Sequence, residues 1–192
     1  IGDVIFEFVE NMEALNESSP IVLSVVASLT SKMSKAFAEY LKKYGEITSQ
    51  DEDKKIFKFP VERQKRVRSL RQKSNSFKRS INLIPRNFLV SYVSEFDCFL
   101  GSLLRVIYTK KPELLNCSSK QITYSELLTF STLSDAKELI LEQEIESILR
   151  KSHSEHFSIL ETKFNMTLRK GLIIWSEFIE ITERRNLFVH AN

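Results

Sequence analysis

The residues best suited to chemistry lie near the end of the chain, in a segment expected to be helical. Within eight positions the segment holds an acid, two arginines, an asparagine and a histidine: Glu183, Arg184, Arg185, Asn186 and His190. At about 100° per residue, Glu183, Asn186 and His190 fall within about 60° of one another, whereas Arg185 lies about 140° from His190. One copy of this helix therefore does not assemble a site unless the long arginine side chain, or a second copy, completes it.

Other groupings of reactive side chains carry weaker signals. Glu138 and Glu142 are spaced to share a cation, but a solvated acidic helix face explains them better. His153 and His156 suit one helix face, yet no third ligand lies near them in the sequence, so we predict no metal site and no cofactor. The chain also lacks a glycine-rich phosphate loop and a Ser–His–Asp arrangement at a strand-to-helix turn.

The terminal segment resembles the signature of the HEPN superfamily, whose members are small helical-bundle proteins and, in many cases, ribonucleases. Its hallmark is an arginine followed after four to six residues by a histidine on a late helix, often with asparagine directly after the arginine. Arg185, Asn186 and His190 match this pattern. The stretch 93–99, which includes Asp97, also resembles the acidic and aromatic part of an early HEPN helix that packs beside the motif. The resemblance covers about residues 85–192.

The bare spacing of arginine and histidine occurs more than once in this chain. Arg150 and His156 satisfy it, and so do Arg184 and His190. We prefer Arg185 because an asparagine follows it. In the alternative interpretation the motif residues are purely structural: Arg185 pairs with a glutamate on its own helix, and His190 only terminates the helix, where a cation is favoured.

The resemblance implies a metal-independent endoribonuclease. His190 would act as base toward the RNA 2′-hydroxyl or as acid toward the leaving 5′-oxygen, because its ordinary pKa near ~6.5 suits both tasks. Arg185 would hold the scissile phosphate and stabilise the charge of its transition state. Asn186 would position the phosphate or orient His190, with Glu183, Arg184 and Asp97 in support.

The resemblance also implies partners and a setting. It implies a homodimer through the motif helix, cellular or phage RNA as substrate, a toxin–antitoxin or antiphage role, and an antitoxin or sensor protein that restrains the activity. Two alternatives stay open: a non-catalytic HEPN module for dimerisation or partner binding, and an unrelated helical adaptor. With two cysteines in no zinc or redox spacing, we expect a reducing, cytoplasmic location.

A basic segment lies at residues 62–79 and has one acid, Glu62. Its cations could follow an RNA backbone, although a solvated face or an acidic partner protein explains them equally well. The segment has one aromatic residue, Phe77, so base stacking is not predicted. The candidates for RNA binding are Arg63, Lys65, Arg66, Arg68, Arg71 and Lys73.

Composition favours an all-α fold, because only 4 glycines and 4 prolines occur among 192 residues and sheet-rich domains need more turn formers. The net charge of +3 excludes binding to nucleic acid through overall charge alone. We predict an antiparallel helical bundle with an N-terminal helical extension. The expected division is an extension at 1–84 and a HEPN-like bundle at 85–192 that lacks its C-terminal end, in what reads as a fragment of a longer protein.

Periodicity and helix-stop residues predict the individual helices. We expect helices at 3–16 and 20–44, separated at Pro20, and at 61–74 and 87–108, separated at Pro85. A strand or extended linker is expected at 46–60. Later helices are expected at 125–128, 135–151 and 155–164, and from about residue 176. The apolar run Ile21–Leu29 is too short to span a membrane and is predicted to be a buried helix segment.

Overall fold

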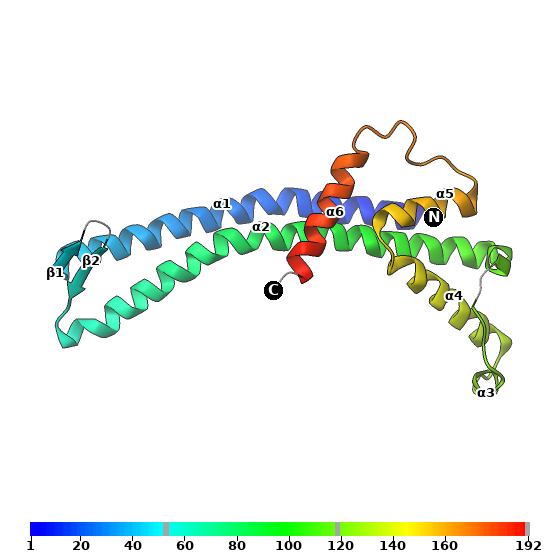
Figure 1. Cartoon of the computed structure of the whole chain (residues 1–192), viewed down its shortest axis with the longest axis horizontal. Coiled ribbons are helices and arrows are strands. Elements are labelled where there is room, and N and C mark those ends of the chain that lie inside the picture. Colours follow the sequence, from blue (N-terminus) through cyan, green and yellow to red (C-terminus); the bar gives the residue numbers. More distant parts are fainter. Residues whose placement is uncertain (52–53, 118–119, 191–192) are drawn as a thin grey trace. The chain divides into compact units, whose positions relative to one another are not determined.

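The structure is a computed structural model that describes residues 1–51, 54–117 and 120–190; the side chains at 49–51, 54–55, 117 and 190 also lie outside the description. The fold is all-α, as predicted, and the described residues contain one sheet of two strands. The elements follow one another as α1 (Gly2–Tyr44), β1 (Glu46–Asp51), β2 (Lys54–Lys58), α2 (Val61–Lys110), a 3₁₀ helix (Pro112–Cys117), α3 (Tyr124–Leu127), α4 (Leu133–Leu149), α5 (His153–Phe164) and α6 (Trp175–His190) (Figure 1).

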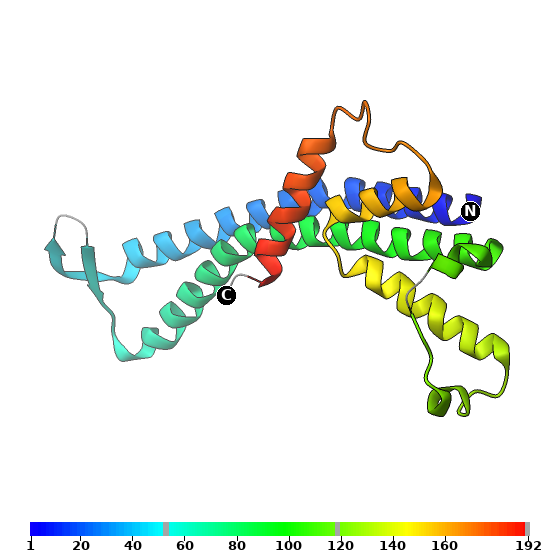
Figure 2. The same ribbon diagram turned by 45° about the vertical axis from the view of Figure 1, so that its right-hand side comes forward.

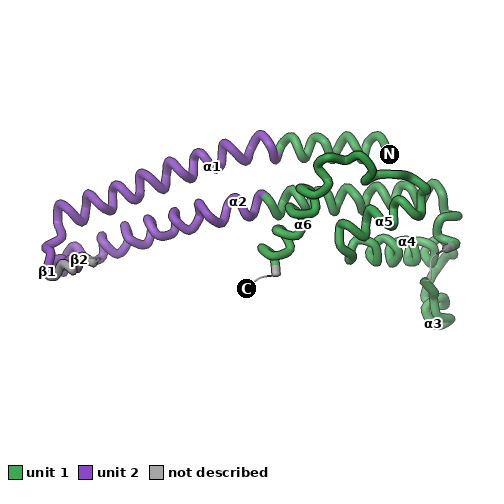
Figure 3. Tube along the Cα trace, turned by 45° about the horizontal axis from the view of Figure 1, so that its top comes forward, with its two compact units in different colours: residues 1–14, 89–192 green, residues 15–88 purple. Residues whose placement is uncertain are grey.

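The chain divides into two compact units (Figure 3). Unit 1 comprises residues 1–14 and 89–192, and unit 2 comprises residues 15–88. The second unit thus ends four residues beyond the predicted boundary. The first 14 residues of the predicted extension belong to the unit that contains the motif helix.

Unit 2 is a hairpin of two helical segments joined by two strands (Figure 2). Two contacts show that the helical segments run antiparallel. The hydroxyl of Thr30 donates to the carbonyl of Phe77, farther along α2, at 3.2 Å. The guanidinium of Arg63, near the start of α2, lies 3.8 Å from the centre of the ring of Tyr44, the last residue of α1. The less exposed side chains of α2 in this unit recur at spacings of three and four residues, which is the repeat of a coiled-coil seam. They include Val67, Leu70, Ser74, Phe77, Ser80, Ile84 and Phe88.

The strands β1 and β2 pair antiparallel from Glu46 with Lys58 to Asp51 with Lys54, with an irregularity between Ile47 and Ser49. The sequence predicted either a strand or an extended linker at 46–60, and the structure has two strands there. Gly45 ends α1 where a larger residue would not fit. A Cβ atom added there would lie 2.7 Å from the Leu41 carbonyl oxygen and from the Phe57 ring.

Two predicted helix breaks are wrong. Pro20 lies inside α1 and Pro85 lies inside α2, so each pair of expected helices is one continuous helix. A proline inside a helix removes one backbone hydrogen bond and costs about 3 kcal/mol. Half-buried apolar side chains lie close to each proline, at Leu23 in α1 and Phe88 in α2, and the packing of such a face offsets this cost.

The core of unit 1 lies where α4 and α5 pack against the later part of α2. Its buried residues come from all three helices: Leu100, Leu104, Tyr108, Leu141, Ile145, Ile148 and Leu160. Glu144 is 7% exposed and forms an ion pair with Lys163, whose ammonium also lies 3.3 Å from the Tyr108 hydroxyl. The buried carboxylate is therefore paired, as burial of a charge requires.

Capping boxes fix where the helices of unit 1 begin. Thr132 caps α4 with Asp135, and Ser152 caps α5 with Glu155. The predicted starts of these helices, at 135 and 155, are each two residues too late, because Ser134 and Ser154 offer a second hydroxyl that could cap a helix. The correction matters for α5, because it places His153 in the first turn.

The apolar run Ile21–Leu29 is not buried, contrary to the prediction. Ile21 is 65% exposed and Val25 52%, and α1 has no residue in the buried class. By length and composition alone, α1 is the one helix in the described part of the chain that could cross a membrane; its 18-residue window has a mean hydropathy of 1.3. This is weak evidence, because a signal sequence near an N-terminus passes the same test.

Candidate functional site

The motif helix α6 turns one face toward the interior of unit 1. Phe178, Thr182 and Arg185 recur at spacings of four and three residues and therefore lie on one side of the helix. Thr182 is completely buried, and its hydroxyl donates to the carbonyl of Ile179 at 2.9 Å. Only 17% of the Arg185 side chain is exposed. This register directs Arg185 inward.

Asp97 of α2 contacts polar side chains from two other helices, α6 and α5. Its Oδ2 accepts a hydrogen bond from Arg185 Nη2, and its Oδ1 lies 3.0 Å from Nε2 of His153, at the start of α5. One carboxylate thus connects three helices, although Asp97 lies 88 positions from Arg185 and 56 positions from His153 in the sequence. Sequence reasoning named Asp97 and Arg185 as site residues but left His153 out.

The other motif residues lie in different surroundings. Arg184 points outward, where 63% of its side chain is exposed, and forms an ion pair of 2.6 Å with Glu180. Glu183 is exposed and Asn186 is half-buried. The backbone of His190 is helical, but its side chain lies outside the described residues, so its predicted role stays a prediction. The structural alternative for Arg185 was an ion pair with a glutamate on its own helix. Arg184 forms such a pair, whereas Arg185 pairs with Asp97 of α2.

Aromatic rings lie beside His153, on one side of this polar contact. The His153 ring lies 5.9 Å from Phe96 and 5.8 Å from Phe178, centre to centre. Phe157 stacks parallel to Phe96 at 6.3 Å and meets Trp175 edge to face at 4.7 Å. These rings lower the local polarity, which strengthens every charge interaction inside them.

His156 lies one helical turn after His153 and is completely buried. Within the part of the chain that the structure describes, neither ring nitrogen has a hydrogen-bond partner. Burial lowers the pKa of His156 below its ordinary value, and the nearby His153 lowers it further, whereas the Asp97 carboxylate and contacts with the backbone of Ile148 and Leu149 act in the opposite direction. The lowered pKa favours the neutral ring, which has one N–H and one lone pair.

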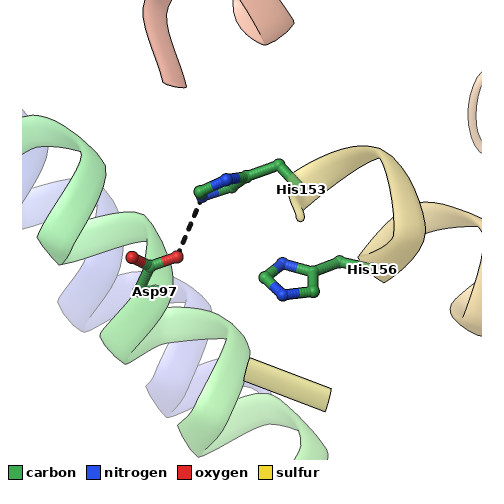
Figure 4. Close-up of side chains that lie close together, drawn as sticks. All are labelled: Asp97, His153 and His156. Atoms are coloured by element: carbon green, nitrogen blue, oxygen red, sulfur yellow. Dashed lines mark hydrogen bonds and ion pairs between the residues drawn. The ribbon is translucent and has the colours of Figure 1, made fainter. Parts of the chain in front are cut away.

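Asp97, His153 and His156 form a cluster that the sequence did not reveal (Figure 4). The sequence argument against a metal site used the lack of a third ligand near the two histidines. The third group lies on another helix, far away in the sequence, where only the tertiary fold can bring it close. The signals available beforehand were the spacing of His153 and His156 on one helix face and the acidic residues in the stretch 93–99.

The basic segment lies in unit 2, on α2. All six candidate RNA-binding residues are exposed. Arg63 covers the ring of Tyr44, while Arg68 and Arg71 line a shallow depression of about 390 Å³ together with Gln72, Asn75, Ser76 and Arg79. The depression thus holds three guanidinium groups and no acid.

Comparison with known proteins adds nothing to this geometry. No family model matches the chain, and neither a curated protein nor a solved structure does.

Proposed function

We propose that this chain is a metal-independent endoribonuclease of the HEPN type, which cleaves RNA by attack of the 2′-hydroxyl on the adjacent phosphate. The observation that carries the proposal is the arginine of the motif. Arg185 is turned inward and held by Asp97, whereas the adjacent Arg184 is exposed and paired on its own helix. A guanidinium fixed in this way has lost much of its side-chain freedom before any phosphate binds, as preorganised catalysis requires.

In the proposed reaction, the 2′-oxygen forms a bond to phosphorus and the bond to the 5′-oxygen breaks. The products are a 2′,3′-cyclic phosphate and a 5′-hydroxyl. A histidine takes the proton of the 2′-hydroxyl, and a second proton passes to the leaving oxygen. In a homodimer, the His190 side chains of the two copies supply these two functions.

Arg185 has the donors that this mechanism needs. A guanidinium carries five N–H groups, and a single carboxylate does not engage all of them. The donors that Asp97 does not engage are assigned to the phosphate, whose charge increases in the transition state. Asn186, half-buried one position later, is assigned to orienting the phosphate or His190.

A non-catalytic helical module for dimerisation or partner binding is the second candidate, and one observation favours it. Leu187, Phe188 and Val189, near the end of α6, are 64%, 42% and 49% exposed. Exposed apolar residues at a helix end are typical of an interface. In that case Arg185 and Asp97 form a structural ion pair only.

A growth and RNA-integrity experiment separates the two candidates. The complete protein is expressed as wild type and with Arg185→Ala, His190→Ala or Arg184→Ala. We expect growth arrest and fragmented RNA from the wild type and from Arg184→Ala, and neither from the other two variants. If the wild type leaves growth and RNA intact, or if all four proteins behave alike, the ribonuclease proposal is wrong.

The chemistry has its own test with purified protein. An RNA with a single 2′-deoxy nucleotide at the cleaved position should resist cutting there and be cut elsewhere, because it lacks the attacking oxygen. Continued cleavage at the deoxy position would show that the nucleophile is water. Activity that survives His190→Ala and requires an added divalent cation would also contradict this mechanism.

A further inference from the structure

The first turn of α5 presents two imidazole rings to the carboxylate of α2 (Figure 4). The cap at Ser152 places His153 and His156 three residues apart at the start of α5, so both side chains leave the same face. Each of Asp97, His153 and His156 offers one ligand atom, and the three atoms lie within 4.8 Å of one another. The widest separation exceeds the roughly 3.4 Å between two ligands of a tetrahedral ion, so binding requires the side chains to move inward by about 1 Å.

His156 supplies an independent observation. It is 0% exposed, and within the described residues neither of its ring nitrogens forms a hydrogen bond of normal geometry, the backbone at Ile148 and Leu149 giving weaker contacts only. Buried polar atoms are almost always paired, and a group without a partner calls for an explanation such as an ion. A cation bound to the lone pair of this ring would provide the missing interaction.

The donor set indicates which cation fits. Two imidazole nitrogens and one carboxylate oxygen are ligands that Zn²⁺ and similar divalent transition metals accept, at about 2.0–2.2 Å each. Two ligands of a tetrahedral ion are then roughly 3.4 Å apart. The 3.0 Å between Asp97 Oδ1 and His153 Nε2 requires only a small adjustment.

The surroundings suit a structural ion. Phe96 and Phe178 lie beside the His153 ring and limit the access of water, which strengthens metal–ligand bonds. Asp97 keeps its other oxygen on Arg185, so the carboxylate contacts both partners, and its single negative charge offsets part of their combined positive charge. An ion here would fasten α5 to α2 and hold the oxygen that contacts the motif arginine.

We propose that Asp97, His153 and His156 bind one divalent transition-metal cation of the zinc class, with water in the remaining position. The ion is structural and takes no part in the cleavage reaction. The proposal does not depend on the ribonuclease activity, since it concerns how α2 and α5 are joined.

Metal content and affinity test the site directly. The chain is expressed without a histidine tag, stripped with EDTA and titrated with Co²⁺, whose visible absorption reports tetrahedral nitrogen and oxygen ligands, and then with Zn²⁺. We expect one equivalent of Co²⁺, displacement by Zn²⁺, and a higher melting temperature with either ion. His156→Gln and Asp97→Asn should each weaken binding by about 100-fold or more.

Two control variants match the ligands in chemistry but lie outside the cluster. Glu95→Gln removes a carboxylate two positions from Asp97, and His190→Gln removes the third histidine of the chain. Both should bind Co²⁺ as the wild type does. Circular dichroism of the metal-free proteins checks that each variant is folded. If His156→Gln does not fold, Asp97→Asn tests the site in its place.

The proposal is wrong if the wild type binds less than one equivalent, if its melting temperature does not respond to the ion, or if the ligand and control variants bind equally. Activity distinguishes this proposal from the previous one. Ribonuclease activity without bound metal would leave the proposed function intact, and metal binding by an inactive chain would leave the site intact.

Discussion

The two units of this chain use arginine in opposite ways. In unit 1, Arg185 is 17% exposed and bound to a carboxylate inside a cluster of aromatic rings. In unit 2, Arg68 and Arg71 are exposed beside a shallow depression that contains no acid. A guanidinium that is buried and paired costs desolvation free energy and is retained where position matters, whereas an exposed one adds a screened charge. The comparison separates a candidate for chemistry from a candidate for nonspecific binding.

The apolar residues differ between the units as well. Leu104 of α2 is completely buried in unit 1, while Leu83 of the same helix is 51% exposed in unit 2. The helix α2 therefore buries few apolar side chains in unit 2 and contributes to a packed core in unit 1. Stability should be concentrated in the core, and the following experiments would break or sharpen that contrast.

The largest expected effect is on the core of unit 1. Leu104→Ala should lower the free energy of unfolding by about 2–5 kcal/mol, because it removes buried methyl groups and leaves a cavity. Leu83→Ala, the matched control, should lower it by less than about 1 kcal/mol. Urea unfolding followed by circular dichroism measures both. Similar losses for the two variants would show that burial does not distinguish the units.

The second effect concerns the ion pair of the motif arginine. Asp97→Asn should lower the free energy of unfolding of the metal-free chain by about 1–3 kcal/mol, because it leaves Arg185 partly buried without its carboxylate. Glu180→Gln removes the partner of the exposed Arg184 and should cost about 0–1 kcal/mol. Equal costs in urea unfolding would mean that the inner pair is no better held than the outer one.

The third effect concerns the exposed cations of unit 2. If the basic segment follows an RNA backbone, Arg68→Ala with Arg71→Ala should weaken the binding of single-stranded RNA and reduce the magnitude of its salt slope by about 1.4, at ~0.7 per phosphate contact. Arg150→Ala, at another exposed arginine, serves as control. A fluorescence-anisotropy titration at several salt concentrations measures the slope. An unchanged slope would show that Arg68 and Arg71 of unit 2 do not contact the RNA backbone.

The smallest effect is on acid stability in unit 1. Hydrogen bonds from Arg169 and, less strongly, from the Leu168 amide lower the pKa of Glu161 to about 2. Because this folded-state pKa lies below the value of about 4.5 that the unfolded chain has, the contribution is fully present above pH 4.5 and is lost as pH falls toward 2. Glu161→Gln should flatten the melting temperature between these pH values. Glu138→Gln, at an exposed acid paired with Arg105, is the control; a wild-type profile in Glu161→Gln would refute the assignment.

Much of the fold follows from local sequence. Few turn formers and clear helical periodicity predicted an all-α chain, and the later helices were located to within two or three residues at the ends that the structure defines. The two helix breaks at Pro20 and Pro85 were wrong because packing on either side of a proline outweighs its local cost. The prediction that Ile21–Leu29 is buried was wrong, because the apolar character of a segment does not reveal whether another element covers it.

The candidate site was predicted only in part. The types and order of Arg185, Asn186 and His190 are visible in the sequence, and a family resemblance suggested Asp97. The inward direction of Arg185, by contrast, depends on the register of α6 against α2. The roles of His153 and His156 depend on a contact across 56 residues. Local rules do not contain such contacts, because the tertiary fold creates them.

The comparison between the inner and outer arginines also gives the most direct test of the proposed activity. Purified wild type, Arg185→Ala and Arg184→Ala are incubated with an end-labelled RNA in the presence of EDTA, and the cleavage rates are compared. The account predicts cleavage by the wild type and by Arg184→Ala, and a loss of about 100-fold or more for Arg185→Ala. Equal rates for the two variants, or no cleavage by a folded wild type, would contradict it.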